Sequence, residues 1–503
     1  MRNTKKNILS TLISQLVITV CGILIPRVMI RTFGSEIYGL TTSITQFLSY
    51  ISLMESGIVF VARAELYAPL ANKDNLQVSR VYYAIKHFFT IVAFIFLGYT
   101  FALSVVYHDI AQVEEIGRRY TFFLIWVMSA GFLLKYLGGL ASQTLIYADQ
   151  KQYVVNIVFT AATVINALLV VLLAKCGCNI LIVKIGSSLI YAAQPIGYWI
   201  YVKRHYKLPR VGKNRSKLKQ KWTGIGQHIA YFLHNNIDVV VLTLFANLEL
   251  VAVYSVYKLV VSSIRKITGS FTSGMEAGFG EMIAKKEQKL LQTEFRKYKH
   301  MLTFVSVVLF GTTAVLIVPF VRLYTADITD ANYIQPVFAV VLLLAEAIDC
   351  FMHPCSSLPI AANQLKQSKW GPYGEATINI VFSLILVHWD PLAGVAVATL
   401  IATIFKAMYY MIFSGRKILQ IPLRGLGFNF ILTNGLIVLY AFVGHMVLRE
   451  DMIQNYGQWI GWGFGVFFVV FCVTSLVFFV CYPAQQKQIA ITVWNKLRPK
   501  KNQ

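Results

Sequence analysis

Charged side chains occur inside several hydrophobic segments of this sequence, where burying a charge costs free energy. A cation at the centre of a membrane helix costs roughly 2.5 to 3.5 kcal/mol on insertion scales, so its presence there is by default a hypothesis of function. Four cations in or bordering such segments could contact an anionic group in a cavity: Arg27, Lys135, Lys258 and Arg265. The alternative is extension to the nearest interface or an internal ion pair. That alternative is favoured for four further lysines: Lys86, Lys184, Lys266 and Lys406.

Two hydrophobic segments also carry polar residues at helical spacing. On a helix, each set of four would share one face: His228, Tyr231, Asn235 and Asp238 in one segment, and Glu346, Asp349, His353 and Ser357 in the other. Such stripes fit a water-filled cavity, in which four residues would serve coupling or gating: Asp238, Glu346, Asp349 and His353. Hydrogen bonding between helices is the alternative, and it is favoured for His228 and Asn235.

The sequence contains no G-x-x-x-x-G-K-[ST] motif, and therefore no means of its own for binding ATP. An ion gradient, or downhill consumption of a product, would have to give any transport its direction. The seven cysteines lie mostly in hydrophobic stretches, where Cys packs as a small apolar residue. Cys176 and Cys178 share a short loop with no His or Cys cluster nearby, so the sequence predicts neither a metal site nor a cofactor.

Composition places the chain among membrane proteins. Of its 503 residues, 57% are hydrophobic and only 14% are charged, which is outside the usual range of soluble globular proteins. A formal net charge of +24 would suggest nucleic-acid binding in a soluble protein. Here, however, Lys and Arg are concentrated in particular loops, as expected from membrane insertion. We therefore predict a multi-pass membrane protein without a nucleic-acid partner.

The longest polar stretch, residues 203–221, contains nine Lys or Arg among nineteen residues. Basic loops beside membrane spans stay in the cytoplasm, so this segment predicts a cytoplasmic linker between two hydrophobic halves. With both termini inside, 32 of the 46 Lys and Arg fall in cytoplasmic segments and 6 in external loops. This bias supports an even number of spans and two cytoplasmic termini.

The predicted fold class is an all-α integral membrane protein with about 14 transmembrane helices. Spans need about 20 apolar residues, and they must be helical because backbone groups in lipid have no water to bond. The expected spans are residues 8–30, 37–61, 81–107, 120–146, 154–174, 180–202, 224–246, 250–274, 300–320, 334–360, 371–389, 392–414, 427–448 and 458–482.

Short internal matches indicate that six spans are repeated. Residues 54–57 (MESG) recur as 275–278 (MEAG), and residues 148–150 (ADQ) recur as 362–364 (ANQ). We predict an N-terminal six-helix lobe at 1–202, a basic linker at 203–223, a C-terminal six-helix lobe at 224–414, and two additional helices with a basic cytoplasmic tail at 415–503. Six is an even number of spans, so the lobes should be related by a pseudo-two-fold axis along the membrane normal. Lys135 and Asp349 would then occupy equivalent positions and could form a gate.

The segment PRVMIRTFGSEIYGL, residues 26–40, resembles the polysaccharide repeat-unit (O-antigen or capsule, Wzx-type) flippases of the multidrug/oligosaccharidyl-lipid/polysaccharide (MOP) exporter superfamily. That family typically ends its first span with Pro and Arg, followed by Gly and then a Tyr-Gly pair that opens the second span. Five residues hold those places here: Pro26, Arg31, Gly34, Tyr38 and Gly39. Residues 236–254 look like the equivalent hairpin of the second half.

The resemblance implies two six-helix lobes around a central cavity that opens alternately to each face. It implies transport of an undecaprenyl-pyrophosphate-linked oligosaccharide from the inner to the outer leaflet of a bacterial cytoplasmic membrane. The intramembrane cations would then neutralise the pyrophosphate. Implied partners are membrane lipids, the lipid-linked oligosaccharide, and the glycosyltransferases and polymerase of the same polysaccharide. The implied role is that of a transporter and not of an enzyme.

Two alternatives remain open. A multidrug cation exporter of the same superfamily would be expected to place an acid in its first span, and none occurs between Ile8 and Ile30. A membrane polysaccharide polymerase or ligase would normally need a large external loop. The predicted external loops are at most about a dozen residues long, so both alternatives are less favoured than the flippase.

Overall fold

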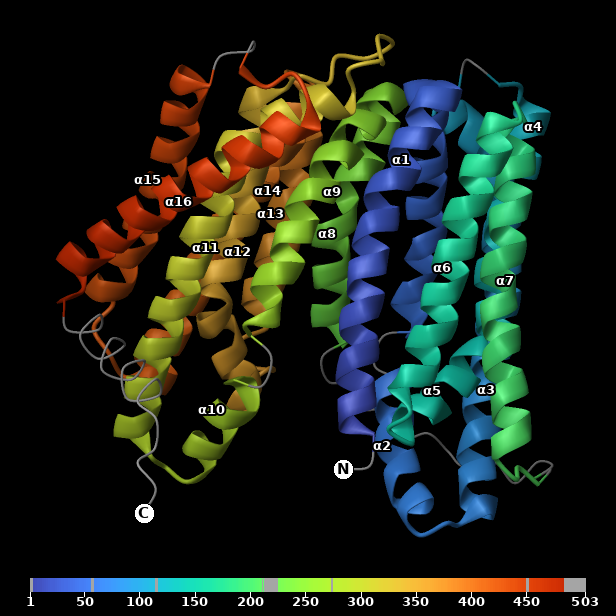
Figure 1. The fold of residues 1–503 in the computed structure, drawn as a ribbon. Helices are drawn as coiled ribbons and strands as arrows, with labels where there is room; N and C mark the ends of the chain where they lie inside the picture. The colour runs from blue at the N-terminus through green and yellow to red at the C-terminus, as the bar shows by residue number, and fades with distance from the viewer. Residues whose placement is uncertain are drawn as a thin grey trace, which may run out of the picture. The chain divides into compact units, whose positions relative to one another are not determined.

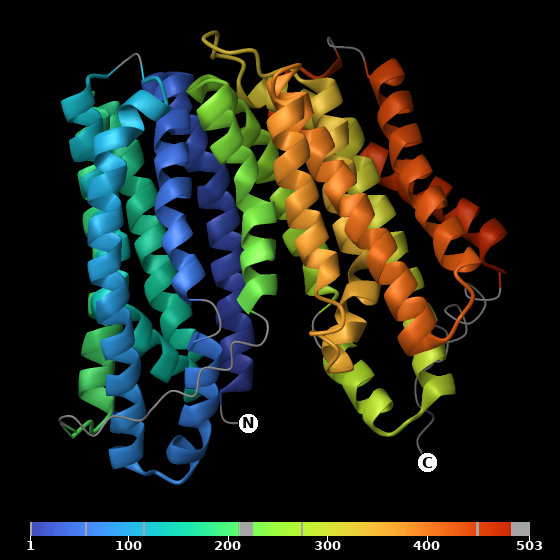
Figure 2. The ribbon, with the colours of Figure 1, turned by 180° about the vertical axis from the view of Figure 1, so that it is seen from behind.

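The computed structural model describes residues 3–55, 58–113, 116–209, 211, 225–272, 275–448 and 452–483. The described chain is helical throughout and forms two compact units (Figures 1 and 2). Unit 1 comprises Met1–Ser255 and Asp327–Ala331, and unit 2 comprises Val256–Ala326 and Asn332–Gln503.

The helices alternate with short connections. Their bounds are α1 (Thr4–Ser49), α2 (Ile58–Ala71), α3 (Asn75–Ile110), α4 (Arg118–Leu134), α5 (Leu140–Ala148), α6 (Gln152–Lys175), α7 (Ile180–His205), α8 (Ile225–Phe245), α9 (Leu248–Ser270), α10 (Met275–Ala284), α11 (Gln288–Tyr324), α12 (Pro336–Ala361), α13 (Trp370–Leu386), α14 (Pro391–Phe413), α15 (Arg424–Val447) and α16 (Tyr456–Cys481).

The fold class predicted from the sequence is confirmed. Within the described residues, ten helical segments are long and apolar enough to cross a membrane. The first of these, Lys5–Glu55, bends at Gly34 (φ 82°, ψ 168°), and its two halves lie side by side in both views. Counting this segment twice and adding α8, α9 and α13 accounts for the fourteen predicted spans.

The bend in α1 uses the residues on which the family resemblance was based. Gly34 adopts a left-handed φ that other residues rarely tolerate. The backbone N–H and hydroxyl of Ser35 donate to the carboxylate of Asp330, at 2.6 and 2.7 Å. Gly39 lies so close to the start of α9 that a Cβ atom would be 1.8 Å from the carbonyl oxygen of Leu248. These contacts all lie within unit 1.

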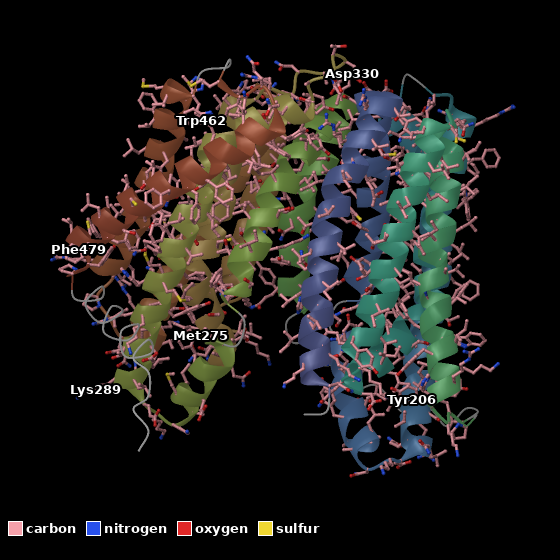
Figure 3. All side chains as sticks on the ribbon, viewed as in Figure 1. Tyr206, Met275, Lys289, Asp330, Trp462 and Phe479 are labelled. Atoms are coloured by element: carbon pink, nitrogen blue, oxygen red, sulfur yellow. The ribbon has the colours of Figure 1, made fainter. Side chains whose placement is uncertain are left out.

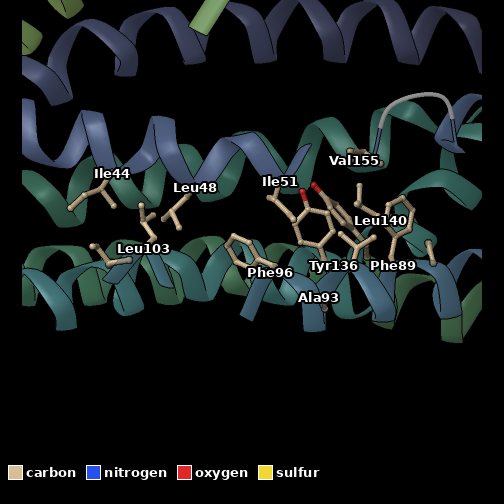
Figure 4. Close-up of a cluster of buried hydrophobic side chains, with 14 of the residues drawn as sticks. Ile44, Leu48, Ile51, Phe89, Ala93, Phe96, Leu103, Tyr136, Leu140 and Val155 are labelled. Carbon is tan, nitrogen blue, oxygen red and sulfur yellow. The ribbon is translucent and has the colours of Figure 1, made fainter. Parts of the chain in front are cut away.

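Aromatic and aliphatic side chains fill the interior of unit 1 (Figure 4). Ile44 and Leu48 of α1 are fully buried, as are Phe89 and Phe96 of α3. The ring of Tyr136 lies among them, with its centroid 5.9 Å from that of Phe96 and 6.2 Å from that of Phe89. This packing fixes the backbone around Tyr136 and therefore the position of the neighbouring Lys135.

A polar cluster closes the end of unit 1 opposite Asp330; Figure 3 labels Tyr206 there. The Tyr206 hydroxyl donates to Asp149 at 2.6 Å, and Lys151 pairs with the same carboxylate at 2.7 Å. Burial, followed by the hydrogen bond to Asp149 and its charge, raises the pKa of Tyr206. Asn7 also ties the start of α1 to this end, because its amide donates to the carbonyl of Gln150 at 2.9 Å.

Unit 2 has its own aromatic core. Phe279 of α10 packs against Phe295 and Tyr298 of α11, with ring centroids 6.3 and 5.8 Å away. A second cluster joins α11 to α15 and α16 through residues such as Val307 and Phe478. The last two helices are therefore packed onto the long helix α11.

Two pairs of residues with positive φ recur along the chain at a constant spacing, which is one residue shorter than the 214-residue spacing of the matched ADQ and ANQ segments. Lys73 and Lys286, which lie 213 positions apart, both follow a short helix and both adopt positive φ, at 56° and 58°. Gln150 and Asn363, also 213 positions apart, adopt φ values of 55° and 54°. The boundary between the two units falls within α9. The predicted linker at 203–223 lies mostly outside the described residues, so the predicted lobe boundaries stay a prediction.

The close contact at Gly39 gives a first testable prediction. Gly39→Ala should prevent α1 from approaching α9, because the added Cβ would overlap the backbone of Leu248. We expect a large loss of folded protein, measured by fluorescence-detected size exclusion and by thermal unfolding in detergent. Gly98→Ala is the matched control, since no atom lies within 4 Å of its added Cβ. Equal melting temperatures for the two variants would contradict this role of Gly39.

Candidate functional site

Unit 1 contains a cavity of about 460 Å³ among α1, α4, α5, α6 and α7. The polar residues that line it include two lysines, two amides and several hydroxyl groups: Thr45, Lys135, Gln143, Lys184, Ser187, Ser188, Tyr191 and Gln194. No Asp or Glu is among the described residues that line it. The lining is therefore both cationic and rich in hydrogen-bonding groups.

Lys135 reaches the cavity from an irregular turn. Residues Lys135–Gly139 form a π-helical turn between α4 and α5, a feature that often marks functional positions in helices. The Lys135 ammonium donates to Glu55 at 2.8 Å, and the hydroxyl of Tyr136 donates to the same carboxylate oxygen. The side chain of Lys135 is 38% exposed and that of Glu55 is 17% exposed. Glu55 thus positions Lys135 while part of the lysine remains accessible.

Neutral polar groups complete this cavity. The hydroxyl of Tyr191 accepts a hydrogen bond from the amide of Asn166 at 3.3 Å. The amide nitrogen of Gln194 is buried and has no acceptor among the described residues. A buried donor without an acceptor is unfavourable, so a bound molecule that supplies an oxygen atom would satisfy Gln194.

Unit 2 contains an ion network of six residues instead: Lys258 and Arg265 of α9, Glu346 and Asp349 of α12, Glu375 of α13, and Lys406 of α14. Glu346 accepts from Lys258 at 2.6 Å and from Arg265 at 2.9 Å. Arg265 also donates to Asp349 at 2.8 Å. Lys406 then joins Asp349, at 2.7 Å, to Glu375, at 2.9 Å.

The ion network is largely buried and electrically balanced. The exposed fractions of its side chains range from 1% at Glu375 to 26% at Arg265. Removing one partner of a buried pair leaves an uncompensated charge, which typically costs about 3–5 kcal/mol. The network consequently holds four helices of unit 2 together, and any change in its protonation would disturb all of them.

Asp238 lies in α8, within unit 1, and is 1% exposed. The hydroxyl of Tyr254 donates to it at 2.7 Å. Along the same predicted stripe, Tyr231 is 51% exposed, so the stripe runs from an exposed position to a buried carboxylate. This carboxylate in a hydrophobic helix remains a candidate for coupling.

The sequence-predicted residues separate into different environments. Lys135 lines the unit 1 cavity, whereas Lys258 and Arg265 lie in the ion network, which is the alternative the sequence left open. Arg27 is partly exposed on α1. Glu346 and Asp349 share one face of α12 as predicted, and His353 on the next turn has a buried Nδ1 atom without a partner among the described residues. Ser357 instead donates to the carbonyl of Pro354 in its own helix.

The suggested gate between Lys135 and Asp349 stays a prediction. Lys135 is paired with Glu55 inside unit 1, and Asp349 is paired with Arg265 and Lys406 inside unit 2. Each of the two residues thus has an ion-pair partner within its own unit.

The sequence analysis assigned no binding or coupling role to four members of these sites. Glu55 entered it only within the matched segment 54–57, and an internal pair or extension to the interface was favoured for Lys184 and Lys406. Glu375 was not singled out, although it is the sole Asp, Glu, Lys or Arg in the predicted span 371–389. Inserting a lone carboxylate into a membrane span costs free energy, as inserting a lone lysine does. Glu375 could therefore have been recognised from the sequence as a candidate functional residue.

Comparison with solved structures shows that the chain shares its fold with a lipid flippase and with transporters, one of them described as a member of the MOP superfamily. The chain matches the lipid II flippase MurJ, in an inward closed conformation, with a TM-score of 0.67, 13% identity, and coverage of 94% of this chain and 98% of that one. It matches an inward-facing multidrug resistance MATE family transporter of the MOP superfamily with a TM-score of 0.59, 13% identity, and coverage of 85% and 98%.

The MATE multidrug transporter DinF-BH matches with a TM-score of 0.55 and 15% identity, over 82% of this chain and 96% of that one. No family model matches the sequence, and no curated protein matches it. At such low identities, the likeness establishes the fold of a multi-pass membrane protein and leaves the cargo to be inferred from the site.

The ion network gives a second prediction. Lys406→Met should destabilise unit 2 by about 3–5 kcal/mol, because Asp349 and Glu375 would remain buried without this cation. Glu375→Gln in the same chain should restore part of the loss, since it removes a buried carboxylate that Lys406 compensated, whereas Asp349 keeps its pair with Arg265. Thermal unfolding of the single and double variants measures this coupling, with Lys366→Met, an exposed lysine, as control. Additive effects of the two changes would contradict a coupled network.

Proposed function

We propose that this protein is a transporter that flips undecaprenyl-pyrophosphate-linked oligosaccharide repeat units from the inner to the outer leaflet by alternating access. The observation that carries the proposal is the unit 1 cavity, in which Lys135 and Lys184 are the charged lining residues of the described chain. Glu55 pairs with Lys135 from outside the lining, and no carboxylate is among the described lining residues. Such a lining favours an anionic cargo over a cationic one. The MOP fold supplies a setting that fits this activity.

The chemistry of the lining matches the two parts of such a headgroup. The ammonium groups of Lys135 and Lys184 would donate charge-assisted hydrogen bonds to phosphate oxygens. Gln143, Gln194 and Ser188 would exchange hydrogen bonds with sugar hydroxyl groups. A volume of about 460 Å³ falls within the usual range of small-molecule sites. It suits a headgroup but not a long prenyl tail, which would stay in the surrounding lipid.

The ion network would provide the change of state that transport requires. In our proposal Lys258 and Arg265 exchange their carboxylate partners for the pyrophosphate during the cycle. Glu346 would then take up a proton, Asp349 would remain paired with Lys406, and His353 and Asp238 would assist as coupling groups. The balanced charges fit this role, because the loss of any one partner leaves the network with a net charge inside the unit.

We also propose an orientation of the protein in the membrane and a bacterial location. Both termini and the basic segment 203–223 would face the cytoplasm of a bacterium, following the distribution of Lys and Arg. Glycosyltransferases would supply the cargo on the inner leaflet, and a polysaccharide polymerase would consume it on the outer leaflet.

A multidrug exporter is the second candidate. The likeness in fold to two MATE transporters and the buried carboxylates Glu346 and Glu375 favour it, because a carboxylate can bind a cationic drug or a proton. The cationic unit 1 cavity argues against it, since like charges would repel such a cargo.

Transport by reconstituted protein tests the proposal. In proteoliposomes loaded with a lipid-linked oligosaccharide, Lys184→Ala should slow the appearance of the sugar in the outer leaflet by roughly ten- to hundredfold. The reason is that a hydrogen bond to a charged group contributes about 1.5–3 kcal/mol. Lys135→Ala combined with Glu55→Gln should have a similar effect without stranding the Glu55 charge. Lys86→Ala, a partly buried lysine of α3 that does not line this cavity, should transport normally.

Two outcomes would overturn the proposal. Wild-type rates in both cavity variants would remove the cavity from the transport path. Efflux of a fluorescent cationic dye by the wild-type protein, without movement of the lipid-linked oligosaccharide, would establish the multidrug alternative in its place.

A further inference from the structure

A second cavity lies in unit 2, among α11, the start of α15 and the end of α16, with a volume of about 310 Å³. Its polar lining combines three basic side chains with an amide and a phenol: Arg296, Lys299, His300, Asn429 and Tyr482. No Asp or Glu is among its described lining residues. Neither the proposed translocation nor the ion network uses this cavity.

Lys299 is the residue that most directly indicates a bound ligand. The residue is 5% exposed, and its ammonium nitrogen is buried without a hydrogen-bond partner among the described residues. A buried ammonium group that lacks an acceptor is strongly unfavourable. His300, beside it, is also 5% exposed, whereas Arg296 is exposed at the mouth of the cavity. The arrangement places cations both inside the cavity and at its entrance.

The N-terminus of α15 contributes a second, independent attraction for an anion. Gly425 of its first turn lines the cavity, and no side chain caps this end of the 24-residue helix. The first N–H groups of a helix lack partners within the helix, and the helix dipole makes this end positive. Helix N-termini of this kind bind phosphate groups.

The remaining polar groups are arranged to donate as well. The amide of Asn429 donates to the hydroxyl oxygen of Tyr482 at 3.2 Å, and the oxygen of the same amide accepts from Thr303 at 3.4 Å. Within the described chain, this pattern leaves the hydroxyl proton of Tyr482 available for an acceptor. Donors thus surround the cavity, and a negatively charged oxygen-rich group is the complementary ligand.

Exposed apolar side chains next to the cavity indicate the source of that group. Phe428 and Ile431 of α15 are 52% and 73% exposed, and Phe479 of α16, labelled in Figure 3, is 61% exposed. Acyl chains of a lipid could lie along these side chains while the phosphate enters the cavity. A free phosphate ion would use only the polar part.

We infer that this cavity is a binding site for the phosphate of an anionic membrane phospholipid, distinct from the proposed cargo site in unit 1. The phosphate oxygens accept from Lys299, Arg296 and the first N–H groups of α15. The bound lipid thereby fastens α15 and α16 to α11. The inference does not depend on what the protein transports.

Thermal unfolding of the full-length protein in detergent, with and without added phosphatidylglycerol, tests the site. Wild-type protein should gain stability with phosphatidylglycerol and much less with phosphatidylcholine, which has no net charge. Lys299→Met should weaken the apparent affinity for phosphatidylglycerol at least about tenfold, because it removes a charge-assisted hydrogen bond. It should not lower the melting temperature of the lipid-free protein, since a buried unpaired charge is removed. Arg296→Gln should weaken binding without affecting the core.

Lys289→Met, on the same helix and exposed, serves as the matched control and should bind like the wild type. Inorganic phosphate is added in a separate arm. If phosphate alone stabilises the wild-type protein as much as phosphatidylglycerol does, and Lys299→Met abolishes both effects, the lipid source is overturned. Unchanged affinity for phosphatidylglycerol in both Lys299→Met and Arg296→Gln overturns the site itself.

Discussion

The need to compensate charge inside a hydrophobic body governs this structure. Lys258, Arg265 and Lys406 are compatible with the interior of unit 2 because Glu346, Asp349 and Glu375 lie within 2.6–2.9 Å of them. Each carboxylate is held by a cation from a different helix, so the pairing and the helix packing depend on one another. In unit 1, two lysines line the cavity, and Lys135 is paired with Glu55.

The two units therefore differ in how their interior charges are arranged, although some of their helix ends are alike. The helix ends at Lys73 and Lys286, and at Gln150 and Asn363, have nearly the same backbone conformation. Their interiors nevertheless differ. Lys135 and Lys184 line a cavity in unit 1, whereas Asp349 of unit 2 is paired with Arg265 and Lys406 in a neutral ion network.

Helix count and type were accessible to sequence reasoning, because a span in lipid must be about 20 apolar residues long and must be helical. The turn at Gly34 was accessible too, since the motif around it resembles a known family. Intramembrane charges such as Lys135 and Asp349 could be recognised one by one. Their partners could not, because Glu55 lies 80 residues before Lys135, and Glu375 lies 31 residues before Lys406.

By itself, then, the sequence determined that this chain is a helical membrane protein with a small number of charged residues inside its hydrophobic segments. Only the tertiary structure decided which cations are neutralised and which line a cavity. It also revealed the basic cavity at Lys299, a residue that sequence position places at the edge of a span. The physical reason is that hydrophobicity acts on each segment locally, whereas the cost of a buried charge depends on distances between helices that are far apart along the chain.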